Sequence, residues 1–127
     1  MKFLFHEEAE AELDRAAAYY ESCRKGLGLD FIREVYAAVS LLTQHPRAWS
    51  PISRNTRKCL VPRFPFGVIY QVKKDHVRII AVADLRRKPE YWRRRKWDRG
   101  QGGTRTRETP GRWKKKSPGL RKQSDKR

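Results

Sequence analysis

The sequence predicts an α+β fold: an N-terminal strand, an antiparallel helical hairpin packed on a small antiparallel sheet with a three-strand C-terminal meander, and a disordered basic tail. Apolar residues recur every three or four positions over residues 7–44 and alternate with a period of two over residues 57–83. From Lys96 onward glycine, proline and charge replace any apolar period. We therefore expect one folded domain in residues 1–95 and a basic, disordered tail in residues 96–127.

The first half of the domain predicts a strand and two helices. The run "KFLF" at residues 2–5 suits a short strand, and from Glu7 the spacing of apolar residues becomes helical to about Arg24. Acidic residues crowd the first turn, where they complement the helix dipole. The two glycines of "KGLG" predict a break, and a second helix should end near Gln44 because Pro46 follows. So short a connection favours an antiparallel hairpin.

The second half of the domain predicts three consecutive strands. "RAWSPISRNT" is expected to be a loop, and "RKCLVPRF" a strand that Pro62 restricts to an edge or a bulge. "FGVIYQV" and "VRIIAVA" follow as strands joined by the tight turn "KKDH", and the chain should leave the sheet at about Asp84. Short turns between neighbouring strands predict an antiparallel meander.

The charge is strongly positive and unevenly distributed. The formal net charge is +17, and residues 96–127 contribute 12 basic and 3 acidic residues against 19 and 11 in residues 1–95. Within the domain, residues 1–34 are mildly acidic and residues 47–95 strongly basic. A basic surface of this kind attracts nucleic acid, an acidic protein or an anionic membrane surface.

Several protein classes fit the composition poorly. No stretch approaches the roughly 18 apolar residues of a membrane span, and no export signal is recognisable. Cys23 and Cys59 lack the spacing of zinc ligands, so we expect two reduced thiols that serve as small packing residues in a cytoplasmic protein. No membrane partner is expected.

Three segments together resemble a toxin of the RelE/ParE superfamily over about residues 2–95. They are "FHEEAEAELDRAAAYYE", "RKCLVPRFPFGVIYQV" and "AVADLRRKPEYW", arranged in the order of strand, helical hairpin and meander. The resemblance implies the toxin of a type II toxin-antitoxin system, held silent by a cognate antitoxin protein. Within that superfamily, RelE-like toxins cut mRNA in the ribosome without a metal, and ParE-like toxins poison DNA gyrase.

The residues that could carry either activity gather in the basic half. Metal-free RNA cleavage needs a proton acceptor, cations for the phosphate charge and a proton donor. The candidate site residues are Arg57, Arg63, Asp84, Arg86, Arg87 and Tyr91 for catalysis in a nuclease, and Lys58, Trp92, Arg94 and Arg95 for binding. Arginine holds two phosphate oxygens at once, and the two aromatic rings could stack on a base or could cover the end of the core. No cofactor or metal is expected.

The general base is the part that is missing. Many relatives have a histidine where this sequence has Asp84, and beside Arg86 and Arg87 the pKa of a carboxylate is expected to fall. We therefore expect Asp84 to be an ion-pair partner of one of these arginines. His6 and His45 fall at helix ends and His76 in a turn, so none is an obvious substitute. Glu7, Glu8, Glu10 and Glu12 are expected to form a solvated helix face.

Three functions remain open on the sequence. The first is a ParE-like toxin that binds gyrase through its basic surface, which the missing base slightly favours. The second is a RelE-like, ribosome-dependent mRNA endoribonuclease. The third is an inactive homologue that binds only its antitoxin, or nucleic acid, through the basic surface and tail.

Overall fold

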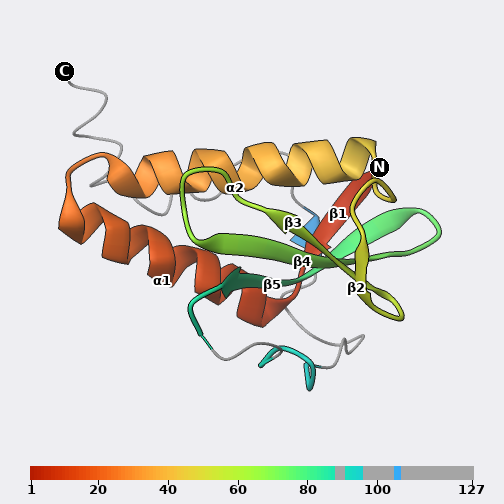
Figure 1. Ribbon diagram of the computed structural model, residues 1–127. Helices are drawn as coiled ribbons and strands as arrows, with labels where there is room; N and C mark the ends of the chain where they lie inside the picture. The colour runs from red at the N-terminus through yellow and green to blue at the C-terminus, as the bar shows by residue number, and fades with distance from the viewer. Residues whose placement is uncertain (88–90, 96–104, 107–127) are drawn as a thin grey trace.

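The computed structural model describes residues 1–87, 91–95 and 105–106, and it confirms the α+β class. Its elements, in chain order, are β1 (Lys2–Phe5), α1 (Glu7–Cys23), α2 (Leu27–Gln44), β2 (Pro51–Ser53), β3 (Thr56–Leu60), β4 (Phe66–Val72), β5 (His76–Asp84) and β6 (Arg105–Thr106). The strands form one sheet in the order β2-β3-β4-β5-β1-β6, and β1 lies parallel to β5. The helical hairpin covers one face of this sheet, and residues 91–95 lie on the other side from α2 (Figure 1).

The helix α1 begins where the sequence predicts. His6 is its N-cap, and the Nδ1 atom of His6 accepts a hydrogen bond from the Glu8 N–H at 3.0 Å. This bond satisfies one of the orphan donors at the helix start, and Glu7, Glu8 and Glu10 place negative charge in the first turn. His6 is buried in this capping role, and its backbone N–H donates to the Ile79 carbonyl oxygen in the middle of β5, away from Asp84.

The connection between the helices differs from the prediction at one of its glycines. Gly26 has φ +89°, which favours glycine, and it forms the N-cap of α2. Gly28 lies inside the first turn of α2, where a Cβ atom would come 2.5 Å from the Ala17 carbonyl oxygen of α1. The Glu21 carboxylate accepts the backbone N–H groups of both glycines at 3.0 Å. Only Gly26 therefore separates the two helices, and Gly28 lets them approach closely.

Gly28→Ala is expected to lower the free energy of unfolding by about 1–3 kcal/mol, because the new methyl group would collide with the backbone of α1. Helix propensity alone predicts the opposite sign, a gain of up to about 1 kcal/mol. Urea unfolding followed by circular dichroism measures the difference. A variant more stable than the wild type would contradict the close approach.

The antiparallel meander is confirmed, with two differences at its first strand. β3 pairs with β4, and β4 pairs with β5, both antiparallel. The segment expected to be a loop contains β2, which pairs with β3 at only two positions. Pro62, expected within the first strand, lies just beyond the end of β3 at Leu60, because the chain already turns there towards β4. Asp84 is the last residue of β5, as predicted.

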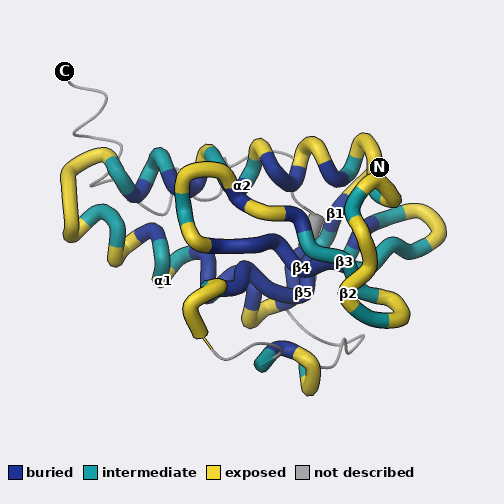
Figure 2. Tube along the Cα trace, viewed as in Figure 1, coloured by how far each residue is buried: buried dark blue, intermediate teal, exposed yellow. Residues whose placement is uncertain are grey.

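Apolar side chains are buried on both faces of the sheet. The main core lies between the helices and the sheet and includes Phe5, Phe31, Val68 and Ile79. A smaller cluster on the opposite face consists of Ile69, Ile80, Ala81, Ala83 and Trp92. The central strands are accordingly buried along most of their length (Figure 2).

The cysteines and the tail were predicted less completely. Both thiols are free; Cys59 packs in the core as expected, whereas Cys23 is exposed.

Most of the predicted disordered tail lies outside the described residues, but Arg105 and Thr106 form β6 and pair with Phe5 and Leu4 of β1. Among the described residues, no helix has the length and apolar content needed to cross a membrane.

Candidate functional site

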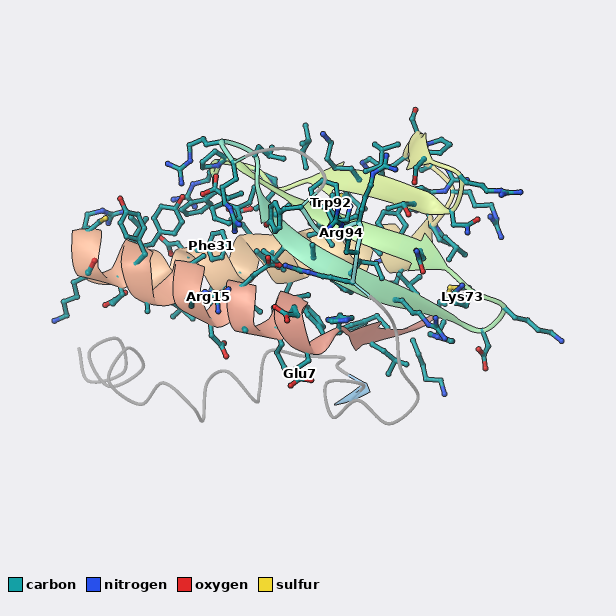
Figure 3. The ribbon with its side chains drawn as sticks, turned by 90° about the horizontal axis from the view of Figure 1, so that it is seen from below. Glu7, Arg15, Phe31, Lys73, Trp92 and Arg94 are labelled. Atoms are coloured by element: carbon teal, nitrogen blue, oxygen red, sulfur yellow. The ribbon has the colours of Figure 1, made fainter. Side chains whose placement is uncertain are left out.

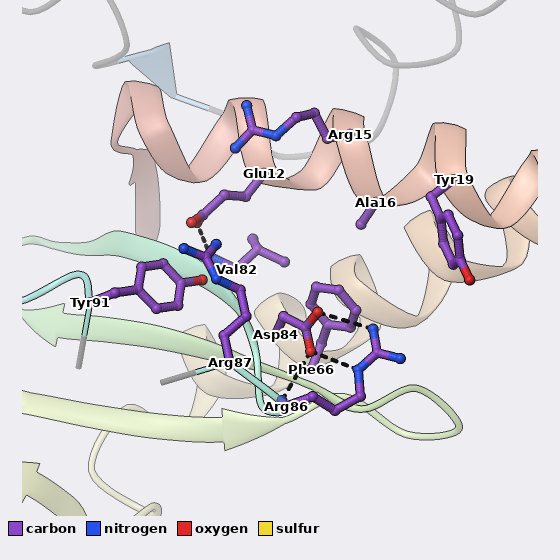
Figure 4. Close-up of a pocket in the computed structure, with 10 residues that line it drawn as sticks. All are labelled: Glu12, Arg15, Ala16, Tyr19, Phe66, Val82, Asp84, Arg86, Arg87 and Tyr91. Atoms are coloured by element: carbon purple, nitrogen blue, oxygen red, sulfur yellow. Dashed lines mark hydrogen bonds and ion pairs between the residues drawn. The ribbon is translucent and has the colours of Figure 1, made fainter. Parts of the chain in front are cut away.

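A pocket of about 280 Å³ opens between the end of β5 and α1. We call it the β5–α1 pocket; it is lined by Glu12, Arg15, Ala16, Tyr19, Phe66, Val82, Asp84, Arg86, Arg87 and Tyr91 (Figure 4). It forms here because β1 ends at Phe5, so that α1, not a further strand, lies beside the last residues of β5. Four of the six residues predicted to serve catalysis, Asp84, Arg86, Arg87 and Tyr91, line this pocket.

Asp84 forms the ion pair that the sequence predicts. One carboxylate oxygen accepts the backbone N–H of Arg86 at 3.0 Å and its Nε at 2.9 Å, and the other accepts Nη2 at 3.0 Å. The side-chain hydrogen bond from Arg86 holds the pKa of Asp84 below its usual value, against a smaller opposing effect of burial. The same contact raises the pKa of Arg86. A carboxylate held ionised in this way is a poor proton acceptor at neutral pH.

Arg87 and Tyr91 form a second unit of the pocket. The Cζ atom of Arg87 lies 3.9 Å from the centre of the Tyr91 ring, a cation–π contact that orients the guanidinium. Burial raises the pKa of Tyr91, and the nearby Glu12 charge raises it further. Tyr91 therefore keeps its proton at neutral pH. Among the described residues, no carboxylate pairs with the guanidinium of Arg87 or of Arg15.

Glu12 and Arg95 were both predicted to be exposed, and both predictions were wrong. Glu12 is 6% exposed and Glu10 is 8% exposed, so the predicted solvated helix face is confirmed only for Glu7 and Glu8. The Glu12 carboxylate takes two hydrogen bonds from Arg95, at 2.6 and 2.9 Å. Arg95, expected to be a surface binding residue, has a side chain only 13% exposed. Burial lowers the pKa of Arg95, but the hydrogen bond and charge of Glu12 outweigh this effect and raise it.

This buried pair completes the edge of β5 that β1 leaves open. The Val82 N–H donates to Glu12 at 3.0 Å, and Arg95 donates to the Ile80 carbonyl oxygen at 3.1 Å. Two main-chain groups that a neighbouring strand would otherwise satisfy are thus satisfied by side chains. The pair also ties residues 91–95 to α1, which fixes Tyr91 at the wall of the pocket.

Trp92 packs in the smaller core cluster, in agreement with the prediction that this ring covers the end of the core. Its side chain is 9% exposed and lies with Ile69 and Ile80 on the face of the sheet away from the helices. Figure 3 shows Trp92 over the strands, with Arg94 beside it. A ring buried in this way does not offer a free face on which an RNA base could stack. Arg94 is exposed and does not line the β5–α1 pocket.

The three basic residues predicted near β3 lie outside the pocket. Arg57 pairs with Tyr70, four residues along β4 from the partner of Asp84, a span of roughly 13 Å. Its guanidinium donates to the carbonyl oxygen of Trp49. Lys58 lays its aliphatic chain beside Gly67 on the face away from the helices.

Arg63 lies at the same end of the sheet as Asp84, but it serves a different contact. It pairs with Glu34 at 3.2 Å and with Asp30 at 3.6 Å, both on α2. The predicted cluster of cations is therefore not formed: Arg86 and Arg87 line the pocket, whereas Arg57 and Arg63 lie outside it and have other partners.

Other residues of the pocket were not predicted, although one signal was available. Arg15 follows Glu12 by three positions on a helix, so the two share a face of α1. Tyr19 and Ala16 continue that face towards Asp84. None of the three histidines lines the pocket. Among the described residues, no group of three or more histidine, cysteine or acidic side chains is placed to hold a metal ion.

Comparison with known proteins points to one family. Residues 3–89 match the family described as "ParE toxin of type II toxin-antitoxin system, parDE". A chain from the solved structure of the chromosomal ParDE TA system from P. aeruginosa is similar in fold, with a TM-score of 0.60 and 20% sequence identity. The similarity covers 67% of this chain and 96% of that one. No curated protein matches the sequence.

Proposed function

The chain belongs to the ParE toxin family of type II toxin-antitoxin systems, and from this premise we propose that it inhibits DNA gyrase by binding it through the β5–α1 pocket. A cognate ParD antitoxin would keep it silent, and the target would place its action in the cytoplasm. The observation that carries the proposal is the ion pair that keeps Asp84 ionised. This carboxylate is held by Arg86, with its pKa lowered, at the position where a nuclease would need a base.

The character of the pocket supports protein binding. Its buried lining residues include the apolar Phe66 and Val82, and its exposed lining residues include Arg15 and Arg87. Arginine and tyrosine around an apolar depression are typical of the residues that dominate protein–protein affinity. Such a surface suits an acidic and partly apolar segment of a target protein.

The mRNA endoribonuclease remains the alternative, because arginine and tyrosine also suit an RNA phosphate and base. Two features weigh against it. Among the described residues, no histidine lines the pocket, Tyr91 keeps its proton, and the Asp84 carboxylate is held ionised by Arg86. Arg57 and Arg63 are occupied elsewhere.

Purified toxin is expected to inhibit supercoiling by gyrase in vitro and to leave ribosome-bound mRNA intact. The measurement runs both assays on one preparation, with toxin pre-mixed with its antitoxin as the silenced control. Cleavage of mRNA with supercoiling unaffected would favour the nuclease. Normal growth of cells expressing the toxin without antitoxin would favour the inactive homologue.

A further inference from the structure

A hollow of about 190 Å³ lies at the end of the sheet where two hairpins turn. We call it the hairpin hollow; the polar residues in its lining are Arg47, Arg54, Asn55, Thr56, Arg57 and Lys73. Arg54 and Asn55 form the turn between β2 and β3, and Lys73 begins the turn between β4 and β5. Both turns lie at the same end of β4, because Arg57 of β3 pairs with Tyr70. Four cations from three segments of the chain therefore meet in one place.

The positive charge of the hairpin hollow is not neutralised by an acidic side chain among the described residues. Residues 47–74 contain seven arginine and lysine residues and no acidic residue. In the part of the chain that the structure describes, no carboxylate pairs with the four cations of the hollow. The Asp75 carboxylate, in the β4–β5 turn, contacts His76 Nδ1 at 2.9 Å instead. The Arg57 guanidinium donates to two backbone carbonyl oxygens of the loop before β2, which orient it without neutralising it.

The lining of the hairpin hollow suits phosphate better than a protein segment or an unpaired base. Arginine presents paired N–H donors to phosphate oxygens, and the Asn55 amide and the Thr56 hydroxyl add uncharged donors. No aromatic ring lines the hollow among the described residues, so a base has nothing on which to stack. The apolar residues described in the lining are Pro51 and Val72, whereas a protein interface has an apolar core. The backbone of duplex DNA needs neither stacking nor an apolar core.

Further cations extend the hairpin hollow along the same end of the sheet. Lys74 is exposed in the β4–β5 turn, and the exposed Lys2 of β1 pairs with His76 just beyond it. The strands from β2 to β1 are neighbours in the order β2-β3-β4-β5-β1, which spans roughly 19 Å at the usual strand spacing. Each strand of DNA carries a phosphate about every 3.4 Å along the helix axis. The cations at this end of the sheet therefore reach several phosphates.

The hairpin hollow and the β5–α1 pocket lie at opposite ends of β4. Val72, the last residue of β4, lines the hollow, and Phe66, its first residue, lines the pocket. The six residue steps between them span roughly 20 Å of strand. Figure 3 shows Lys73 at the end of the sheet away from Arg15 of α1. A protein bound in the pocket therefore leaves the hollow accessible to a second ligand.

We propose that the hairpin hollow binds the phosphate backbone of duplex DNA, so that the toxin contacts the DNA held by gyrase while the β5–α1 pocket contacts gyrase itself. The choice of duplex DNA rests on the proposed function, because gyrase acts on duplex DNA and a toxin bound to it lies beside that DNA. The contact is independent of base sequence, since phosphates carry no sequence information.

The test measures binding of the full-length chain to a fluorescent duplex of about 20 base pairs, by anisotropy at about 0.1 M salt. Arg47→Ala/Arg54→Ala removes two exposed arginines of the hollow and is expected to weaken binding about tenfold. Arg24→Ala/Arg33→Ala is the matched control, because it removes two exposed arginines that do not line the hollow. It is expected to weaken binding less than about threefold, since salt screens distant charges. Urea unfolding checks that both double variants keep the stability of the wild type.

Salt dependence provides the readout specific to phosphate contacts. The slope of log Kd against log salt concentration is expected to fall by about two in Arg47→Ala/Arg54→Ala and to stay nearly unchanged in the control. The basic residues 96–127 are the same in all three proteins, so the difference between the variants isolates the hollow. Two duplexes of unrelated sequence are expected to bind equally.

Four results would overturn the inference. The first is a wild-type chain that does not bind the duplex, and the second is an equal loss in the two double variants, since net charge alone would then explain binding. The third is tighter binding of an unpaired RNA of the same length that depends on the hollow, which would make RNA the ligand. The fourth is binding to phosphatidylglycerol vesicles that depends on the hollow while binding to DNA does not, which would make an anionic membrane the partner.

Failure of the inference and failure of the proposed function are distinguishable when the supercoiling assay is run on the same three proteins. DNA binding that depends on the hollow, by a toxin that leaves gyrase active, would overturn the gyrase proposal and keep this one. Inhibition of gyrase together with equal DNA binding by both double variants would do the reverse.

Discussion

Replacing Glu12 with alanine is expected to lower the free energy of unfolding by about 3–5 kcal/mol, because it leaves a buried guanidinium without its counter-ion. Among the described residues, the Arg95 guanidinium would keep its hydrogen bond to the Ile80 carbonyl oxygen and its contact with the Tyr91 ring, and the Val82 N–H would lose its acceptor. Both side chains of the pair are largely buried, at 6% and 13% exposed, so water can replace the lost partner only after local opening. Urea or thermal unfolding at neutral pH measures the effect.

Three variants test the mechanism of this loss. Glu7→Ala removes an exposed carboxylate from the same helix and is expected to cost at most about 1 kcal/mol through the helix dipole. Glu12→Gln keeps an acceptor for Val82 but removes the charge, and is expected to cost about 2 kcal/mol. The double variant Glu12→Ala/Arg95→Ala is expected to be less destabilised than the two single changes added together. Equal losses in Glu12→Ala and Glu7→Ala would show that the pair does not stabilise the fold.

Arg86→Ala and Arg87→Ala are each expected to raise the toxin concentration needed for half-inhibition of gyrase by about tenfold, and the double variant by about a hundredfold. Arg87 presents a guanidinium that Tyr91 orients, and Arg86 is held in place by Asp84. Both are exposed, and an exposed ion pair contributes only about 0–1 kcal/mol, so folding should be preserved. The supercoiling assay with purified proteins measures the change.

Arg33→Ala is the matched control for these arginines. It removes the same charge from an exposed position on α2 that does not line the β5–α1 pocket, and it is expected to inhibit gyrase as the wild type does. Should it lose as much activity as Arg87→Ala, the net positive charge of the chain, and not the pocket, would carry the effect. Inhibition unchanged in the double variant would remove the β5–α1 pocket from the proposal.

Local pattern was sufficient for most of the elements. The strand "KFLF", both helices and the strands "FGVIYQV" and "VRIIAVA" were predicted close to their observed bounds, because apolar periodicity and capping residues act over a few positions. The prediction was wrong where a tertiary contact overrides a local rule. Gly28 reads as a helix breaker but lies in a helix, since the close approach of Ala17 needs a residue without a side chain.

Candidate residues were predicted well where they are neighbours in sequence and poorly where they are not. The pairing of Asp84 with Arg86 spans two residues and follows from adjacency. The pairing of Glu12 with Arg95 spans 83 residues, and no pattern in either segment identifies the other. Arg57 and Arg63 look equivalent in the sequence, yet one holds the loop before β2 and the other pairs with α2.

The sequence by itself determined the first strand, the two helices and the three meander strands, the superfamily, the basic character of residues 47–95 and the ion pair at Asp84, but not β2 or β6. These depend on short-range spacing and on composition, which the chain carries wherever it folds. Only the tertiary structure decided which charges are buried, that Trp92 belongs to the core, and where the β5–α1 pocket lies. Burial and pockets arise from the packing of segments distant in sequence: α1 meets the end of β5 because β1 stops at Phe5.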